Sequence, residues 1–386
     1  MGVKFRTRAA THVVVGGGIH GLCTAYFLAS SGQDVIVVER NARVGLDASG
    51  VNAGTLSVQN KRVEFTTQAI ESVTLWQQLA EETGNGFEFR RFGGLALAET
   101  SVEINQLRNK VLQQRAAGLE VEFIEGTTLH KEYPYLSNSV EAAAFCSLDS
   151  KANPLKACDA IKTLAERHGA RVICGADVQS IRALPNGGFH LETSAGGFGA
   201  DQVLVTGGTR ISQLFSFMGL ELPSFYVMAT QVLVTDQLPP FVPHVVTHTG
   251  PSLTLKQTDN GSLLIGGGWP ANVDDEQQAS SPRLDSIVSN LRLAARVIPR
   301  LRECTIVRGW SGRHARVGDE RPLLGPVPGF KGLFVIGCTS GGFTFGPYYA
   351  KITAALMVGQ RTTSISADCL ISRLVRPVLQ SAETAV

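Results

Sequence analysis

The chain has 386 residues, of which 44% are hydrophobic and 18% are charged, a composition typical of a folded globular protein rather than a disordered one. Lys and Arg number 35 against 33 Asp and Glu, and because the basic residues are scattered, the sequence offers no basic patch for a nucleic acid. At roughly 150 residues per domain, this length predicts about two domains.

The spacing of the cysteines and the first residues of the sequence indicate whether to expect a metal site and in which compartment to expect the protein. None of the seven cysteines forms a C-x-x-C pair, so their spacing predicts neither a zinc site nor an iron–sulfur site, and we expect no metal. The basic start lacks the apolar stretch of a secretory signal, and no apolar run approaches the roughly 18 residues of a membrane span. We therefore expect reduced thiols, a cytoplasmic location and no membrane span.

The first predicted elements form a β-turn-α-β unit. Residues 11–15 are nearly all β-branched, which predicts a strand buried on both faces in a parallel sheet. Apolar residues then recur at helical spacing over 22–29, and Gly32 is a suitable helix end. A second strand is predicted over 34–38, directly before Glu39.

The middle of the chain mixes helices with shorter strands. We predict helices over 63–83, 102–118 and 156–169, with a glycine-rich strand over 90–98. Further strands are predicted over 170–181, 188–193, 202–205 and 333–337, and a last helix over 349–358. Alternating stretches at 227–235, 252–257 and 262–266 predict an antiparallel sheet, which we expect to form the floor of a substrate site.

Gly16, Gly18 and Gly21 satisfy G-x-G-x-x-G directly after a predicted strand, and Glu39 ends the next one. The first glycine permits a tight turn, the second lets the backbone approach a pyrophosphate, and the third allows close helix packing. The intervening Ile19 and His20 open the helix. The carboxylate of Glu39 is expected to accept from an adenosine ribose hydroxyl. The unit therefore predicts a dinucleotide cofactor, with a purely structural glycine turn as the alternative.

The residues after Glu39 help to distinguish a nicotinamide dinucleotide from FAD as the cofactor. A nicotinamide enzyme would continue with βαβ units, whereas here a glycine-punctuated loop spans residues 45–55. Small residues and exposed amides in such a loop suit a ligand that runs past the helix end, which favours FAD. An ordinary surface loop is the alternative, and composition alone leaves it open.

Four separated stretches together resemble the D-amino-acid oxidase superfamily of flavoproteins. They are residues 15–21 with Glu39-Arg40, residues 48–54, residues 310–325 from Trp310-Ser311-Gly312-Arg313 to Gly325, and residues 332–347. The style of residues 52–54 and 261–268 is closer to the FAD subunits of proline, hydroxyproline and opine dehydrogenases than to the oxidases.

The resemblance implies an α/β protein with a Rossmann-type FAD-binding domain and an antiparallel-sheet substrate domain. The flavin domain is expected from residues 1–60, 145–215 and 305–386, and the substrate domain from 61–144 and 216–304. Non-covalent FAD is expected. Besides the fingerprint residues, the resemblance implies FAD contacts from Arg40, Ser49, Asn52, Ala53, Gly54, Thr55, Val178, Thr206, Gly207, Gly341, Gly342, Phe343 and Thr344.

The resemblance also implies roles around the reacting end of the flavin. Backbone amides of residues 341–344 lie beside the flavin pyrimidine ring in the relatives, where negative charge develops on reduction. Relatives often carry His where this chain has Gly341, so an imidazole contact is absent. Arg313 matches the arginine that grips the substrate carboxylate in glycine-oxidase-like relatives. His314 replaces the usual proline, and because arginines in loops are more often solvated, a structural role for Arg313 is the alternative.

Three histidines, a lysine and a cysteine are further candidates for a part in the chemistry. His314, His244 and His248 are candidate bases for the ammonium proton, each equally suited to a surface role. Sarcosine-oxidase-type relatives use a lysine in the sheet to help oxygen react; Leu264 aligns there, with Lys256 on a neighbouring strand. Cys338 follows a strand near the flavin, but its spacing to Gly341 departs from that of relatives with covalent flavin.

The sequence as a whole predicts an FAD-dependent oxidoreductase. We expect it to oxidise the C–N bond of an amino acid or N-substituted amino acid of proline, hydroxyproline or opine type, by hydride transfer to the flavin. A dehydrogenase subunit with redox partners in a hetero-oligomer is favoured. The alternatives are a free-standing, peroxide-forming amino-acid oxidase and, from another class, a non-catalytic or RNA-modifying flavin-binding protein.

Overall fold

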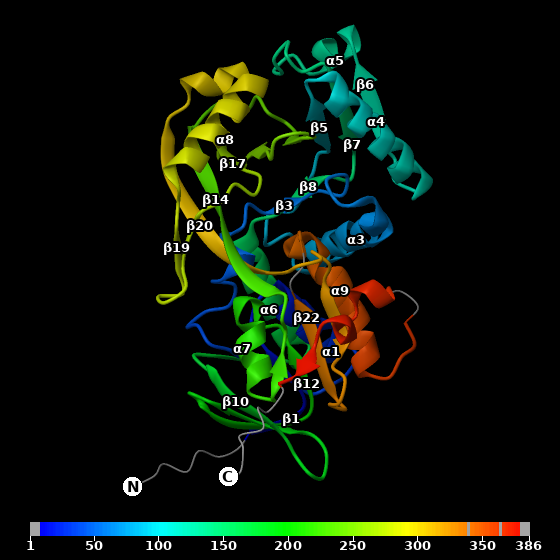
Figure 1. The fold of residues 1–386 in the computed structure, drawn as a ribbon, viewed down its shortest axis with the longest axis vertical. Helices are drawn as coiled ribbons and strands as arrows, with labels where there is room; N and C mark the ends of the chain where they lie inside the picture. The colour runs from blue at the N-terminus through cyan, green and yellow to red at the C-terminus, as the bar shows by residue number, and fades with distance from the viewer. Residues whose placement is uncertain (1–7, 338–339, 363–364, 379–386) are drawn as a thin grey trace, which may run out of the picture.

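The structure is a computed structural model that describes residues 8–337, 340–362 and 365–378. Two large sheets occupy different ends of an elongated molecule, and two long strands, β14 (Phe225–Gln237) and β20 (Ile306–Val317), run between the two ends (Figure 1). The first and last described residues lie together at the lower end in this view.

The lower sheet has a parallel centre. Its order is β10-β11-β12-β1-β2-β9, with β22 beside the last residues of β12 and β21 beside β22. Strands β12, β1, β2, β9 and β22 run parallel, and β10, β11 and β21 are antiparallel additions. The strands of this sheet are β1 Arg8–Val15, β2 Val35–Glu39, β9 Arg171–Cys174, β10 Val178–Ala183, β11 Phe189–Thr193, β12 Gly196–Val205, β21 Leu323–Pro326 and β22 Leu333–Gly337.

Burial on both faces explains why the first strand ends in an apolar run, Val13 to Val15. Val14 packs into a cluster with helix α1, whereas Val13 and Val15 pack into a second cluster on the opposite face, with α7. Successive side chains of a strand alternate between faces, so a strand covered on both sides needs apolar residues at every position. Helix α1 packs against α6 and α9, and α9 also packs against α3.

The helices of the described residues are α1 Ile19–Ser30, α2 Ala48–Val51, α3 Thr66–Glu82, α4 Ser101–Ala116, α5 Thr127–Glu132, α6 Pro154–Arg167, α7 Ile211–Ser216, α8 Leu284–Val297 and α9 Gly342–Met357. A capping box at Thr100 and Glu103 begins α4. Asn153 caps α6 by accepting from the Lys156 amide, with Pro154 in the first turn.

The upper sheet is mostly antiparallel, in the order β20-β14-β17-β16-β15-β5-β7-β6, with one parallel pair between β15 and β5. Helix α8 packs on β17, and α4 packs on β5 and β7. Its other strands are β5 Gly94–Ala98, β6 Glu122–Glu125, β7 Ala142–Cys146, β15 Val245–His248, β16 Thr254–Gln257 and β17 Ser262–Gly266. Three smaller sheets pair β3 (Thr55–Leu56), β8 (Ser150–Lys151) and β4 (Arg90–Arg91); β18 (Asn272–Asp274) and β19 (Ala279–Ser281); and β13 (Leu220–Glu221) and β23 (Arg376–Pro377).

The mixed α/β fold class is confirmed, and several element predictions are corrected. The single strand predicted over 90–98 is two strands in different sheets, because Gly93 takes a positive φ of 79° between them. The stretch 170–181 likewise divides into β9 and β10, which lie at opposite edges of the lower sheet. Helix α9 begins at Gly342 rather than Tyr349. The domain boundaries remain a prediction.

Candidate flavin and substrate site

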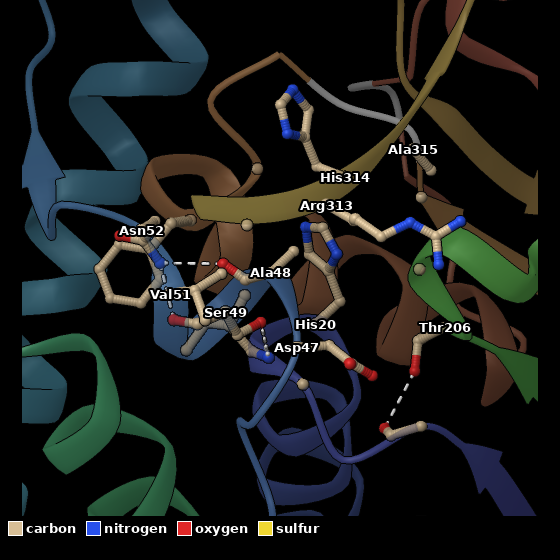
Figure 2. Close-up of a pocket in the computed structure, with 18 of the residues that line it drawn as sticks. His20, Asp47, Ala48, Ser49, Val51, Asn52, Thr206, Arg313, His314 and Ala315 are labelled. Carbon is tan, nitrogen blue, oxygen red and sulfur yellow. Dashed lines mark hydrogen bonds between the residues drawn. The ribbon is translucent and has the colours of Figure 1, made fainter. Parts of the chain in front are cut away.

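The site is a cavity of about 500 Å³ beneath the upper sheet. Residues of the first glycine turn, the start of α1, α2, β20 and the start of α9 line it. Figure 2 shows this convergence, with His20, Asp47 and Ser49 below β20 and His314 and Arg313 on it. Segments far apart in the sequence therefore share one cavity of the size usual for ligand sites.

The glycine turn gives α1 an N-cap residue without a side chain, so the N-cap position itself offers no side-chain cap. Gly16 takes a φ of 114°, and a Cβ there would lie 2.7 Å from the Thr206 carbonyl oxygen. A Cβ on Gly21 would lie 2.0 Å from the Gly16 carbonyl oxygen, so only glycine lets α1 approach this closely. Gly18 is the N-cap residue. The turn thus places backbone N–H groups at the cavity, as an anionic ligand requires.

Glu39 is held at the end of β2 by two backbone donors. Its Oε2 accepts from the Gly17 amide at 2.6 Å and its Oε1 from the Asn41 amide at 2.8 Å. Burial raises the pKa of this carboxyl, and the two backbone hydrogen bonds oppose that shift. The side chain is nearly fully buried yet lines the cavity.

The glycine-punctuated loop folds back over this turn. Asp47 precedes the short helix α2, the Ser49 hydroxyl accepts from the Ile19 amide at 3.0 Å, and Asp47 pairs with Arg40 at 3.0 Å. Asn52 closes the loop by donating to the carbonyl oxygens of Ala48 and Ser49 (Figure 2). The surface-loop alternative therefore does not describe this loop, because most of its residues line the cavity.

Two further segments complete the end of the cavity that lies near Glu39. Thr206, after β12, donates from Oγ1 to the carbonyl oxygens of Val15 and Gly16, at 2.9 and 3.1 Å. Val178 lines the cavity at the start of β10, beside Asp177, which forms an ion pair with Arg210.

The other end of the cavity is formed by the start of α9. Gly341, the N-cap residue, has a left-handed backbone with φ 73°. The carbonyl oxygen of Thr344 accepts from Ser72 Oγ at 2.7 Å and from Trp76 Nε1 at 3.0 Å, which anchors the first turn to α3. His20 lies beside the backbone of Gly342, and burial lowers its pKa to about 4.

Arg313 lies on a strand, not in a loop as expected, because β20 pairs with β14 along nearly its whole length. Its guanidinium pairs with Asp275 at 2.8 Å, and its Nε is buried without a partner. The Arg313 side chain is 14% exposed and that of Asp275 is 79% exposed. Arg313 and His314 leave the strand in different directions (Figure 2).

Of the three candidate bases, only His314 lines the cavity. Burial, aided by the nearby Arg316, lowers its pKa to about 4. His244 Nδ1 is 3.0 Å from the Tyr135 hydroxyl, and His248 Nε2 is 3.2 Å from a Glu99 carboxylate oxygen. The structure thus places both of these histidines within the upper sheet region and away from the cavity lining.

Leu264, which aligns with the lysine of sarcosine-oxidase-type relatives, lies opposite Lys256, because the two residues are paired between β17 and β16. Lys256 is 2% exposed and donates from Nζ to the Ala53 carbonyl oxygen and to Thr55 Oγ1. Burial lowers its pKa to about 7. Lys256 therefore connects the sheet to the loop that lines the cavity.

Most of the predicted site residues line the same cavity. Arg313 and every predicted FAD residue except Gly21 and Gly54 line the cavity. Gly54, with φ 67°, packs so closely that a Cβ would lie 2.1 Å from the Ala152 carbonyl oxygen. The sequence prediction omitted Asp47, Lys61 and Arg316, which also line the cavity, because no motif marks them. Cys338 lies outside the described residues.

These residues fit FAD. A helix start with a glycine N-cap suits a pyrophosphate, the buried Glu39 carboxylate suits a ribose hydroxyl, and the anchored start of α9 offers amides at the far end. Within the described residues, His, Cys, Asp and Glu side chains form no cluster of three or more that could hold a metal ion. No helix in the same part of the chain has the length and apolar character needed to cross a membrane.

Comparison with known proteins agrees with this geometry. The family described as "DAO: FAD dependent oxidoreductase" matches residues 11–356. The B subunit of opine oxidase from Agrobacterium tumefaciens is 25% identical, over 92% of this chain and 95% of that protein. Mouse mitochondrial dimethylglycine dehydrogenase is also 25% identical, but this chain spans only 41% of its length.

A glycine oxidase and a proline dehydrogenase share the fold. The crystal structure of glycine oxidase from Geobacillus kaustophilus has a TM-score of 0.84 at 24% identity, covering 95% of this chain and 99% of that one. L-proline dehydrogenase from P. horikoshii has a TM-score of 0.85 at 22% identity, covering 93% and 96%. With its family match over most of the sequence, the chain belongs to the DAO family of FAD-dependent oxidoreductases.

Proposed function

We propose that this chain oxidises the carbon–nitrogen bond of an amino acid or N-substituted amino acid of proline, hydroxyproline or opine type, as the FAD subunit of a dehydrogenase. The observation that carries the proposal is the single cavity in which the nucleotide-binding turn, the start of α9 and Arg313 meet. Similarity to the B subunit of opine oxidase over nearly its whole length supports the substrate class and a hetero-oligomer with redox partners.

Bound FAD, held non-covalently, supplies the acceptor for a hydride from the substrate carbon. The protein supplies position and electrostatics. The start of α1 would hold the pyrophosphate and Glu39 the ribose, while amides of Gly342, Phe343 and Thr344 would face the negative charge that develops on reduction.

Arg313 would hold the substrate carboxylate. Its planar guanidinium binds a carboxylate through two parallel hydrogen bonds, which fixes the neighbouring carbon. Asp275 is a weak competitor, because an ion pair with a 79% exposed carboxylate contributes little in water. A substrate carboxylate would take its place and also reach the unpaired Nε.

No side chain is assigned as the base. His314 lies at the cavity, but a pKa of about 4 leaves it neutral and weakly basic at pH 7. A neutral imidazole does not repel an ammonium substrate, and release of that proton to solvent suffices for the neutral amine to react.

A peroxide-forming oxidase is the second candidate, and Lys256 favours it. This lysine is buried beside Ala53 and Thr55, which line the cavity, and its lowered pKa lets it exchange a proton near neutral pH. A cationic group at that position would favour the reaction of oxygen with reduced flavin by stabilising negative charge on oxygen.

The test is anaerobic mixing of the purified flavoprotein with proline, hydroxyproline, sarcosine, D-amino acids and opines while the flavin absorbance is followed. Bleaching by a secondary amino acid supports the proposal, and bleaching by none of the substrates contradicts it. Admission of air then separates the candidates, since rapid stoichiometric peroxide indicates the oxidase and persistence of reduced flavin indicates the dehydrogenase.

A further inference from the structure

Lys256 is a buried cation without a counter-ion. Its side chain leaves β16 on the same face as Thr254, which lies two residues earlier and lines the cavity. Lys256 is 2% exposed, and in the part of the chain that the structure describes no carboxylate pairs with it. Lysine is almost never fully buried without a partner, because an unpaired charge in the interior is unfavourable.

The charged groups near Lys256 supply no free negative charge. Lys151 acts on Lys256 electrostatically, but its own ammonium group forms an ion pair with Asp259 at 2.6 Å. Asp259 also pairs with Arg90 at 3.4 Å. Burial, with a contribution from the charge of Lys151, therefore lowers the pKa of Lys256 to about 7.

Two hydrogen bonds connect Lys256 to the end of the cavity at which the flavin ring is expected. Its Nζ donates to the Ala53 carbonyl oxygen and, at 2.7 Å, to Thr55 Oγ1, and both of these residues line the cavity. The carbonyl oxygen of Thr55 accepts from Thr344 Oγ1 at 3.3 Å. Thr344 belongs to the first turn of α9, whose amides are expected beside the ring that becomes negative on reduction. The ammonium group and the helix start therefore lie at the same end of the cavity.

A negative charge that appears near a buried, unpaired lysine favours the protonated form of that lysine. We propose that protonation of Lys256 is coupled to reduction of the flavin, so that the Lys256 ammonium is the counter-charge of the reduced flavin. When two electrons and one proton enter the flavin, Lys256 Nζ takes up a second proton, from solvent. The inference rests on the proposed binding of FAD, and it concerns reduction of the flavin rather than the later reaction with oxygen.

This coupling has a definite dependence on pH. Below about pH 7, Lys256 is protonated whether the flavin is oxidised or reduced, and its charge favours the reduced flavin. Above that pH the oxidised protein must take up the proton during reduction, so the advantage falls as the pH rises. Well above the pKa of Lys256 in the reduced protein, the lysine is neutral in both states and the advantage is lost.

The midpoint potential of the flavin measures the coupling without any amine substrate. Anaerobic reduction with dithionite in the presence of reference dyes gives the potential at pH 6, 7, 8 and 9. At pH 6 the wild-type potential is expected to exceed that of Lys256→Met by about 30 mV or more, which corresponds to a tenfold or larger preference for the reduced flavin. Above pH 7 this difference should shrink by up to about 30 mV per pH unit, as one proton per two electrons requires. Subtracting the variant removes the flavin's own dependence on pH.

Two further variants separate the charge of Lys256 from its hydrogen bonds. Lys256→Gln keeps an N–H donor for Ala53 or Thr55 but carries no charge, so it is expected to behave as Lys256→Met does. Lys151→Met is the matched control, because it removes a neighbouring lysine whose charge already has Asp259 as counter-ion. This control is expected to keep the wild-type dependence on pH. Titration with oxidised FAD at pH 8 checks that each variant still folds and binds the cofactor.

Three results would overturn the coupling. The first is an equal potential of wild type and Lys256→Met at pH 6. The second is a difference that stays constant from pH 6 to pH 9, because a constant difference means that no proton is exchanged. The third is wild-type behaviour of Lys256→Gln, which would assign Lys256 to holding Ala53 and Thr55 in place. Dithionite reduces the flavin whatever the substrate is, so failure of every amine to bleach the flavin would contradict the proposed oxidation and leave this test intact.

Discussion

Trp310 donates a hydrogen bond from its indole Nε1 to the carbonyl oxygen of Val51, 2.7 Å away. This bond joins β20, which carries Arg313, to the short helix α2 above the glycine turn. Gly312 lies at the same contact, since a Cβ there would be only 2.1 Å from Val51 Cγ2. The strand and the helix are therefore in direct contact beside the cavity.

This contact predicts that Gly312→Ala destabilises the protein. The added methyl group meets a stiff β-branched side chain, so we expect the free energy of unfolding to fall by about 1–3 kcal/mol and the Kd for FAD to rise. Gly309→Ala on the same strand is the control, because its Cβ would meet the end of the flexible Leu233 side chain, at 2.9 Å. Urea unfolding and FAD titration of both variants provide the measurement, and equal effects would contradict the prediction.

Glu39→Gln is expected to weaken FAD binding by about tenfold or more. A hydrogen bond from the ribose hydroxyl to the charged carboxylate would be lost or weakened, at about 1.5–3 kcal/mol of binding free energy. Both carboxylate oxygens also accept from backbone amides, so a glutamine must turn its NH₂ group toward one of these donors, which lowers folding stability. Glu82→Gln is a suitable control, because among the described residues Glu82 accepts only from the Tyr26 hydroxyl and a glutamine retains one acceptor oxygen. Unchanged FAD affinity in Glu39→Gln would remove the carboxylate from the cofactor site.

Arg313 and Asp275 are expected to change substrate affinity in opposite directions. Arg313→Met should raise KM about 30-fold, since it removes charge-assisted hydrogen bonds that contribute about 2 kcal/mol. Asp275→Asn should lower KM by about two- to threefold, because it removes a competing carboxylate from an exposed ion pair. Steady-state kinetics with the best substrate checks both, and a rise in KM in Asp275→Asn would indicate that the ion pair holds Arg313 in place.

Lys256 predicts a rise of folding stability with pH. Its pKa falls from the ordinary 10.5 to about 7 in the folded protein, so the unfolded chain binds more protons between about pH 7 and 10.5. Stability attributable to this group should therefore increase as pH rises through that window, by up to about 1.4 kcal/mol per unit, and level off below pH 7. Urea unfolding of wild type and Lys256→Met at pH 7, 8 and 9 isolates the slope, which the variant should lack.

Local sequence patterns predict the nucleotide half well, because single elements determine it. The β-branched run before Gly16 is a strand buried on both faces, and each glycine of the turn has a steric reason visible at its own position. Residues 341–344 line the cavity, and their contact with the flavin stays a prediction. Gly342, Gly346 and Pro347 concealed the first turns of α9 from a propensity argument.

The substrate side was harder to predict, because its residues line a cavity and therefore lack the regular apolar pattern of residues that pack in a core. Strand β20 pairs along one edge only and carries Arg308, Arg313 and Arg316, so it lacks the apolar alternation of a half-buried strand. Lys61 belongs to no motif, and its position beside Gly341 depends on the tertiary fold. Helix α8 is absent from the predicted elements although the sequence carries a signal for it, since Asn290, Leu293 and Val297 recur at helical spacing and are buried.

The order in which the lower sheet is assembled has a consequence for biosynthesis. Strand β22 and helix α9 form one wall of the cavity and lie near the carboxyl end of the chain, whereas the glycine turn is made first. A nascent chain on the ribosome therefore exposes the edge of β12 that β22 later covers, and it cannot enclose the nucleotide until β22 and the start of α9 have emerged. Cofactor capture is thus a late event, and chains that terminate early are candidates for aggregation rather than for partial function.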